Sequence, residues 1–437
     1  MSSPLHSWGR YPHTPQAAHA CSWVSDVAAL RDGVLAAHGT TLAYGNGRSY
    51  GDSCMAASDH VLHMRTLDRF IHVDWQQGVV QAEAGVTLAE ILAISIPQGW
   101  FLSVTPGTQF ATLGGAIAND VHGKNHHLRG TFGNHVRRFG LLRHNEEPLS
   151  CSPNENTELY AATIGGLGLT GIITWAEIQL IPIRASQMDS KVVRFDNLAE
   201  FFSLSAELDH QHEYSVAWID CLAKGAQTGR GVFIVGDHAR YGSLEVDERA
   251  KLSVPLTPPI SLINNLSLRA FNDLYWRVHP AQSTRKRSSY EPFFYPLDRI
   301  LHWNRIYGRR GFQQYQCVIP DAVAEVVMRD LLSAIAESGQ GSFLAVLKRC
   351  GDIASPGLLS FPLPGTSLAL DFPQKADLAR LFTRLDAIVR EGGGRLYPAK
   401  DAHMSGADFR QAYAGWERLE ALRDPSLNSH FWKRVTQ

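Results

Sequence analysis

The clearest alternation of strand and helix patterns runs from Gln314 to Tyr397. Short apolar runs rich in β-branched residues predict strands, and longer stretches with apolar residues at helical spacing predict helices. In chain order these are the strand QYQCVIP, the helix with Val323, Val326, Val327, Leu331 and Ile335, the strands FLAVLK and SLALDF, the helix with Leu378, Leu381, Phe382, Leu385 and Ile388, and the strand RLY. The order β-α-β-β-α-β is the split βαβ pattern, so we expect a sheet with helices packed on one face.

The chain before Arg184 has a different sequence pattern, in which short predicted strands alternate with glycine-rich turns. One helix is predicted there. Thr87 and Glu90 have the spacing of a capping box, and apolar residues follow at helical spacing until Pro97 and Gly99 end the helix. The two regions together predict an α+β protein of two domains.

The stretch LTPPISLINNLSLRAFNDLYW, within residues 253–276, is apolar but is interrupted by Pro258 and Pro259. We interpret it as a loop packed on the core, since connecting segments usually lie on a protein surface. A flexible lid and a surface that contacts lipid are the alternatives.

Composition excludes several classes of protein. The 437 residues carry 41 Lys+Arg and 42 Asp+Glu, so the formal net charge of -1 gives no electrostatic reason to expect a nucleic-acid partner. The sequence has no apolar run of about 18 residues and no signal peptide, which predicts a cytoplasmic protein. The six cysteines are scattered without a C-x-x-C pair, so we expect reduced thiols.

The most informative segment is PGTQFATLGGAIANDVHGKNHH, from Pro106 to His127. Its glycines let backbone approach a ligand closely, and its threonine hydroxyls and backbone N–H groups can donate to phosphate or ring oxygens. Similar glycine-bearing segments are GNGRSYGD, from Gly45, and IGGLGLTG, from Ile164. These segments predict a cradle for a cofactor.

Common cofactor motifs do not fit this cradle. Gly45 and Gly47 are not followed by the glycine spacing and long helix that a Rossmann fingerprint needs. Lys124 is not in the register of a Walker loop. His122, His126 and His127 have no carboxylate partner at ligand spacing, so we predict polar histidines there and no metal.

The segments SWGRY, GNGRSYGD, the Pro106–His127 run, FGNHV and GGLGLTGII resemble the FAD-binding (PCMH-type) domain of the vanillyl-alcohol oxidase superfamily. The resemblance continues through QYQCVIP, FLAVLK, SFPLPG, ALDFP and RLYPAKD, and it is greatest to the branch that oxidises polyprenylphosphoryl ribose. It implies an FAD-binding domain of residues 1–184 with 395–437. An inserted substrate domain of residues 185–394 would hold an antiparallel sheet covered by helices.

The resemblance also implies the cofactor-binding residues. They are Ala43, Gly45, Asn46, Gly47, Arg48, Ser49, Tyr50, Gly51, Ser53, Gly107, Thr112, Gly114, Gly115, Asn119, His122, Ile173 and Tyr397. Many members of the superfamily link FAD covalently to a histidine at the position of Arg48. Arginine cannot form that bond, so we expect non-covalent FAD.

Oxidation of an alcohol by FAD requires a carbon positioned for hydride transfer and a group that takes the hydroxyl proton. The resemblance implies that Lys400, Tyr50 and His122 are the catalytic residues, without deciding which is the base. It places Gln314, Gln316, Lys348 and Ala369 around the substrate. Tyr307 and Trp218 are candidates for stacking on the sugar or for a lid, and packing in the core is the alternative for each of these aromatics. Some members have a cysteine at the position of Ala369, so this chemistry does not need a thiol.

The implied activity is oxidation of a secondary sugar hydroxyl to a ketone, at C2 of a polyprenylphosphoryl ribose. A separate NAD(P)H-dependent short-chain reductase would complete epimerisation to arabinose, in polysaccharide synthesis of the cell wall. Peripheral membrane contact would then run through residues 253–276. The alternatives are oxidation of a soluble sugar, alditol or nucleotide-linked sugar, and a non-catalytic subunit that binds flavin or glycolipid.

Overall fold

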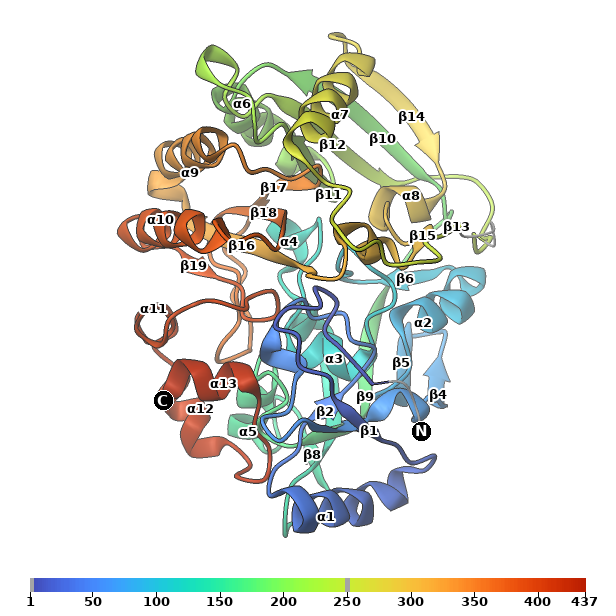
Figure 1. The fold of residues 1–437 in the computed structure, drawn as a ribbon. Coiled ribbons are helices and arrows are strands. Elements are labelled where there is room, and N and C mark those ends of the chain that lie inside the picture. The colour runs from blue at the N-terminus through green and yellow to red at the C-terminus, as the bar shows by residue number, and fades with distance from the viewer. Residues whose placement is uncertain (1–3, 248–251) are drawn as a thin grey trace.

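Two large antiparallel sheets form the framework of the protein (Figure 1). The computed structural model describes residues 4–247 and 252–437. The larger sheet has eight strands in the order β14-β10-β12-β11-β17-β18-β16-β19. Their bounds are β10 Met188–Phe195, β11 Tyr214–Ile219, β12 Gly231–His238, β14 Thr284–Ser288, β16 Phe312–Pro320, β17 Ala345–Cys350, β18 Gly365–Pro373 and β19 Arg395–Leu396.

The split βαβ pattern predicted from the sequence is confirmed in the second half of this sheet. Helix α9 (Ala324–Ser338) follows β16, and helix α10 (Leu378–Glu391) follows β18. Both helices pack on the same face, together with α6 (Leu198–Leu208), as their positions in Figure 1 show. Apolar residues of alternate strand positions and of the three helices share one core, which leaves the opposite face of the sheet available for a site.

The second sheet has six strands. They are β4 Phe70–Asp74, β5 Val79–Glu83, β6 Trp100–Leu102, β7 Val136–Leu142, β8 Leu149–Cys151 and β9 Ile172–Pro182. The predicted helix after Thr87 is present as α2 (Leu88–Ser95), and its capping box forms as expected. The glycine-rich run contains a short helix, α3 (Leu113–Ala118), which begins where the Thr112 hydroxyl accepts a hydrogen bond from the Gly115 N–H.

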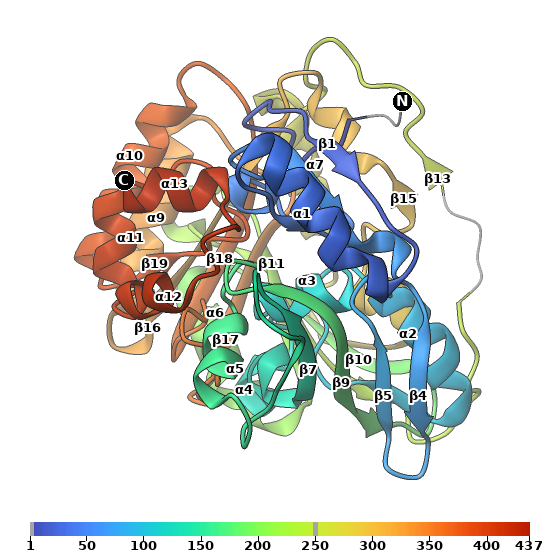
Figure 2. The same cartoon turned by 90° about the horizontal axis from the view of Figure 1, so that it is seen from below.

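A small parallel sheet lies near the amino terminus, in the order β1-β3-β2. Its strands are β1 Ala17–His19, β2 Ala43–Tyr44 and β3 His60–His63. Helix α1 (Val27–His38) packs beside it, as Figure 2 shows. The sequence analysis missed this helix. Its buried side chains are only Val27, Arg31 and Val34, so the apolar stripe is too short to stand out in the pattern.

The prediction of a loop within residues 253–276 is wrong for the second half of that stretch, because α7 extends over Asn265–Val278. Pro258 and Pro259 precede the helix and do not interrupt it. The helix begins where the Asn264 side chain accepts hydrogen bonds from the N–H groups of Leu266 and Ser267. The second half of a stretch that its prolines led us to interpret as a loop is therefore a helix with a regular N-cap.

The two ends of the chain meet beside the glycine-rich loops. The carboxy-terminal helices are α11 Gly406–Ala412, α12 Trp416–Leu422 and α13 His430–Thr436. Arg434 on α13 forms ion pairs with Asp52 at 2.8 Å and with Asp401 at 2.9 Å. These contacts bring residues near 400 to the loop that carries Tyr50. The domain boundaries at 184 and 395 stay a prediction.

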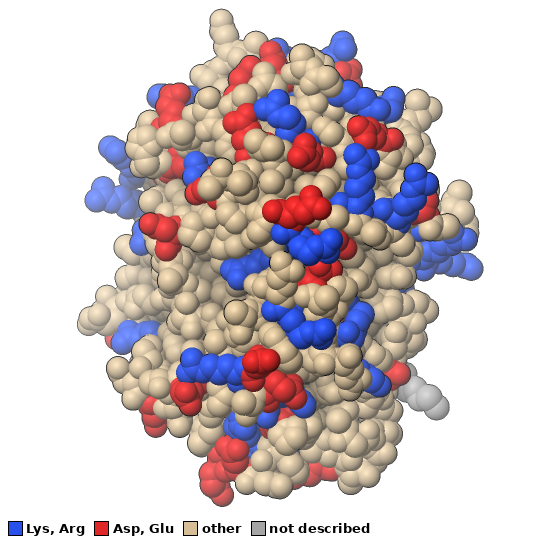
Figure 3. Space-filling model, turned by 90° about the vertical axis from the view of Figure 1, so that its left-hand side faces the viewer, with Lys and Arg blue, Asp and Glu red and all other residues tan. Residues whose placement is uncertain are grey.

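All six thiols are free, and four of them, Cys151, Cys221, Cys317 and Cys350, are buried. In residues 4–247 and 252–437, no helix has both the length and the apolar character that crossing a membrane requires. Acidic and basic side chains are interspersed over the face of the molecule drawn in Figure 3.

Candidate active site

A cavity of about 940 Å³ lies between the glycine-rich loops and the free face of the eight-stranded sheet. Its volume is at the upper end of the range typical of small-molecule and cofactor sites. One wall is made of glycine-rich backbone and the other of alternate side chains from the sheet. The sheet side chains are Ser190, Val192, Val216, Trp218, Ile234, Thr284, Lys286, Ser288, Gln314, Gln316, Val346, Lys348, Ser367 and Ala369.

The strand register explains which polar residues reach the cavity. Gln314 and Gln316 on β16 line it, while Tyr315 between them is in the core below the sheet. On the neighbouring strand, Asp371 pairs with Gln314 and Ala369 pairs with Gln316. Because side chains alternate between faces along a strand, the two glutamines share one face with Ala369 and Asp371.

Nearly all the predicted cofactor-binding residues line this same cavity, on the side away from the sheet. They are Ala43, Gly45, Asn46, Gly47, Arg48, Ser49, Tyr50, Ser53, Gly107, Thr112, Gly114, Gly115, Asn119, His122, Ile173 and Tyr397. A Cβ added to Gly45 would lie 2.4 Å from the Thr112 hydroxyl oxygen, whereas one added to Gly107 would meet no atom within 4 Å. Gly107 therefore faces open space that a cofactor can fill.

Gly51 and Tyr307 do not line the cavity, in contrast to the sequence prediction. A Cβ on Gly51 would lie 1.7 Å from the backbone oxygen of Asp401, so this glycine is needed for the packing of the two chain ends. Tyr307 is 1% exposed and stacks on Phe312 at 4.2 Å, which places it in the core behind the wall.

Arg48 lies between two aromatic rings, with its guanidinium carbon 4.1 Å from the centre of the Trp8 ring and 5.1 Å from that of Phe110. Its Nε is buried and has no hydrogen-bond partner in the described part of the chain. A buried donor without a partner favours an anionic ligand, because an unsatisfied N–H of a charged group is costly. The diphosphate of FAD fits this position and the surrounding glycine backbone.

Lys400 reaches the cavity from the carboxy-terminal segment. Its Nζ lies 3.9 Å above the centre of the Tyr50 ring. Burial lowers the pKa of Lys400 to about 8, although the carboxyl group of Asp371 acts in the opposite direction. Burial raises the pKa of Tyr50 well above its usual value, so its phenol stays protonated near neutral pH.

Asp371 is a functional residue that the sequence analysis did not single out. It is fully buried, and its Oδ1 accepts a hydrogen bond of 2.7 Å from the Gln314 amide nitrogen. Its Oδ2 is buried without a hydrogen-bond partner among residues 4–247 and 252–437. Burial raises the pKa of Asp371 to about 7, against the influence of Gln314 and Lys400. An aspartate at an inward position of a central strand, in LALDFP, was the available signal.

His122 faces Gln316, with 3.2 Å between the His122 Nε2 and the Gln316 amide nitrogen. The amide nitrogen can only donate, so His122 Nε2 accepts and the neutral ring carries its proton on Nδ1. Burial, followed by the charge of Lys348, holds the pKa of His122 well below its usual value. His122 is therefore a neutral hydrogen-bonding group and a weak base.

Two further lysines lie in the wall. Lys348 donates a hydrogen bond of 2.8 Å to the backbone oxygen of Gly123, which leaves its ammonium with spare donors. Lys124, which the sequence analysis did not place in the site, also lines the cavity and donates to the backbone oxygen of Phe293. Burial lowers the pKa of Lys124 to about 7.

The far end of the cavity is bordered by α7. Phe271 and Tyr275 of that helix line it, and the centre of the Tyr275 ring is 4.6 Å from that of Trp218. The Trp218 indole N–H donates to the backbone oxygen of Phe343, which fixes the ring in place. Trp218 therefore lines this end of the cavity, between the sheet and the helix.

Comparison with known proteins identifies the cofactor domain. Residues 15–152 match the FAD binding domain family. The chain is 36% identical to decaprenylphosphoryl-beta-D-ribose oxidase of Mycolicibacterium smegmatis over 400 residues, which cover 88% of this chain and 86% of that protein. It is 33% identical to an uncharacterized protein in the mprA 5' region of Streptomyces coelicolor, over 78% of this chain and 96% of the other.

A more distant similarity is confined to part of the chain. L-gulonolactone oxidase of Bos taurus is 31% identical over 31% of each chain. The cofactor is therefore FAD, as the glycine-rich cradle and the superfamily motifs predicted, and the expected resemblance is confirmed. The extent of the first match shows that this protein is an FAD-dependent oxidoreductase that belongs to the family of decaprenylphosphoryl-beta-D-ribose oxidase.

Proposed function

We propose that the protein oxidises a secondary hydroxyl of a lipid-linked sugar phosphate to a ketone, at C2 of a polyprenylphosphoryl ribose. The observation that carries this proposal is one continuous cavity, in which Lys400, His122 and the pair Gln314 and Gln316 face the glycine-rich cradle. The printed name of the relative from Mycolicibacterium smegmatis supports the same substrate class.

The reaction removes two electrons and two protons from the carbinol. Bound FAD supplies the two-electron acceptor for the hydride from carbon. The hydroxyl proton has to pass to the protein as the carbonyl forms. Of the three candidate bases, Tyr50 has a pKa well above its usual value and His122 one well below it, while that of Lys400 is about 8. A general base works best when its pKa is near the operating pH, so we assign the proton to neutral Lys400.

The other polar residues position the sugar. Amides can donate and accept, so Gln316 and Gln314 suit the vicinal hydroxyls of a sugar ring. His122, held neutral, offers the same kind of contact. Tyr50 holds the Lys400 nitrogen above its ring at 3.9 Å. Lys348 and Lys124 are two of the basic residues in the wall, and their amines suit a substrate phosphate. FAD is held by Arg48 and the glycine backbone without a covalent bond.

The surface around the far end of the cavity supports a lipid-linked substrate. Exposed apolar side chains lie on α7 and on the segment before it: Leu256 is 78%, Ile260 75%, Leu266 80% and Leu274 63% exposed. The same helix places Phe271 and Tyr275 in the cavity wall. Exposed apolar groups beside a site opening suit peripheral contact with a membrane that carries the lipid substrate.

A separate NAD(P)H-dependent short-chain reductase is the partner we propose for the ketone product.

Reduction of the flavin in an anaerobic stopped-flow experiment tests the substrate class. Polyprenylphosphoryl ribose should bleach the flavin absorbance of the FAD-loaded protein, and ribose 5-phosphate and free alditols should not. Rapid bleaching by the soluble sugars alone would favour the second candidate, an oxidase of soluble substrates. No bleaching by either class would point to the non-catalytic alternative.

The apolar surface has its own test. Leu266→Gln and Leu274→Gln should raise KM for the lipid-linked substrate in vesicles and leave KM for a short-chain, water-soluble analogue unchanged. Val326→Gln is the matched control, since Val326 is 65% exposed on α9 and lies outside the proposed surface. Equal effects of all three substitutions would argue against membrane contact at α7.

A further inference from the structure

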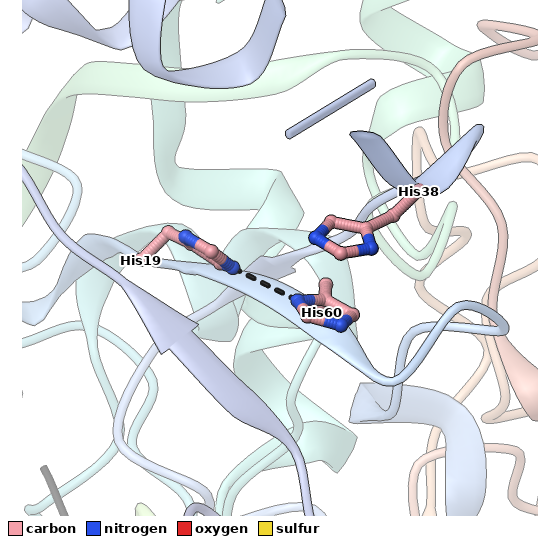
Figure 4. Close-up of side chains that lie close together, drawn as sticks. All are labelled: His19, His38 and His60. Atoms are coloured by element: carbon pink, nitrogen blue, oxygen red, sulfur yellow. Dashed lines mark hydrogen bonds between the residues drawn. The ribbon is translucent and has the colours of Figure 1, made fainter. Parts of the chain in front are cut away.

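Three histidines converge on the small amino-terminal sheet, outside the cavity described above. The ring nitrogens of His19, His38 and His60 include a set, one from each residue, that lie within 4.8 Å of one another (Figure 4). The His19 Nε2 and the His60 Nδ1 are 3.0 Å apart. The His38 ring stacks on that of His60 with 3.4 Å between centres.

The sheet register accounts for this convergence. Strands β1 and β3 are parallel, and Ala17 lies opposite His60. His19 is two residues after Ala17, so alternation puts the His19 and His60 side chains on the same face. Leu62, on that face as well, packs with Val27 and Val34 of α1. The face is therefore the one that α1 covers, and His38 is the last residue of that helix.

The backbone that carries the three rings is held in place. Helix α1 ends at Gly39, which has a positive φ of 78° and donates its N–H to the Leu35 oxygen at 2.8 Å. The Thr41 hydroxyl donates to the His60 backbone oxygen at 2.9 Å. The carboxyl end of a helix carries partial negative charge, which favours a cation beside His38.

We propose that His19, His38 and His60 form a binding site for one Zn²⁺ ion, with water as the fourth ligand. Zinc–nitrogen bonds of about 2.0–2.1 Å in a tetrahedron place ligand nitrogens roughly 3.3 Å apart. The pair from His19 and His60 is close to that separation at 3.0 Å. His38 is exposed, so its ring is free to turn toward the same point, and water can reach the fourth position.

The ligand set favours a transition metal such as zinc over an alkaline-earth cation. Imidazole suits zinc, copper and nickel, whereas magnesium and calcium prefer oxygen ligands. Residues 4–247 and 252–437 hold no second group of three clustered histidine, cysteine or carboxylate side chains of this kind. A metal here would join β1, α1 and β3, so its effect would be on the stability of the amino-terminal segment and not on the oxidation.

The test is a calorimetric titration of the FAD-loaded, chelator-treated protein with ZnCl₂ at pH 7.5. We expect one equivalent to bind, with a Kd in the micromolar range or below, and MgCl₂ to give no binding. His19→Gln, His38→Gln and His60→Gln should each weaken zinc binding by about tenfold or more. His72→Gln is the matched control, since His72 is an exposed histidine on strand β4.

Thermal unfolding supplies a second measurement that does not depend on activity. Zinc should raise the Tm of the native protein and of His72→Gln, and leave the Tm of the three site variants unchanged. Unchanged FAD content and unchanged Tm without zinc would show that the variants are folded. Zinc binding that is equal in all variants, or no binding by the native protein at 100 μM zinc (roughly 100-fold above a micromolar Kd), would overturn the proposal.

Discussion

Gln314 on β16 donates a hydrogen bond of 2.7 Å from its amide nitrogen to the carboxyl group of Asp371, directly across the sheet on β18. This contact holds a buried carboxyl group beside Gln314, on the face of the sheet that borders the cavity. The electrostatic influence of Asp371 raises the pKa of Lys400, which burial lowers. The pair on the sheet therefore adjusts the basicity of a lysine that arrives from the other end of the chain.

Two substitutions of Lys400 test whether this residue acts as a base or only supplies a positive charge. Lys400→Met should lower kcat/KM by roughly 10²–10⁴-fold, the usual contribution of a positioned base. Lys400→Arg keeps the positive charge but stays protonated at every working pH, so we expect it to be as inactive as the methionine variant. Steady-state rates with a redox dye measure both. Near-native activity of Lys400→Arg would contradict the assignment of the proton.

The pH dependence of kcat/KM should follow Lys400. If the neutral amine takes the proton, activity rises with pH up to about 8, the pKa of Lys400, and then levels off. Asp371→Asn removes the charge that raises this pKa, so the rise should move to lower pH. Asp371 thus acts as a positioning residue. A purely structural role would lower the rate without moving the profile.

Asp371 should also affect stability in a definite pH window. Its pKa is about 7 in the folded protein against 3.8 for an ordinary aspartate, so the folded state binds more protons between these values. Stability should therefore fall as the pH rises from about 4 to about 7. Asp371→Asn should remove part of this fall. Urea denaturation at pH 5 and pH 7.5 measures the free energy of unfolding. An equal change in this free energy between the two pH values in the native protein and in Asp371→Asn would contradict the burial of an ionisable group.

Two glycine substitutions should separate cofactor binding from folding. Gly107→Ala places a methyl group in open cavity space, so we expect stability without FAD to change by less than about 0.5 kcal/mol while FAD affinity falls. Gly51→Ala forces a methyl group onto the Asp401 backbone, which should cost about 3 kcal/mol of stability. Flavin content after dialysis and the free energy of unfolding give the two readouts. Loss of stability in Gly107→Ala would show that its Cβ does not point into the cavity.

Acid precipitation should release the flavin. The superfamily resemblance places Arg48 where a covalently linked FAD would need a histidine, and its guanidinium is held between Trp8 and Phe110. We expect a yellow supernatant and a colourless pellet after precipitation with trichloroacetic acid. A yellow pellet would mean that another side chain is bonded to the cofactor.

The sequence allowed a good prediction of elements with strong local signals. The capping box of Thr87 and Glu90 set the start of α2, and apolar periodicity located α9, α10 and the strands around them. Helix α1 was missed because few of its apolar side chains are buried. Helix α7 was missed because Pro258 and Pro259, shortly before it, suggested a loop. Gly51 was placed in the site by its position in a motif and Tyr307 as an aromatic that could stack on a sugar, although packing directs both elsewhere.

By itself the sequence determined the fold class and a cofactor cradle, because apolar periodicity and glycine spacing are local properties of the chain, and the resemblance of its motifs to a known superfamily gave FAD and the family. Tertiary structure alone decided that Lys400 lies over the Tyr50 ring and that Asp371 lies beside Gln314. It also decided that three histidines from β1, α1 and β3 meet. Such contacts depend on strand register and on the meeting of the chain ends, which join residues far apart in sequence and leave no periodic signal between them.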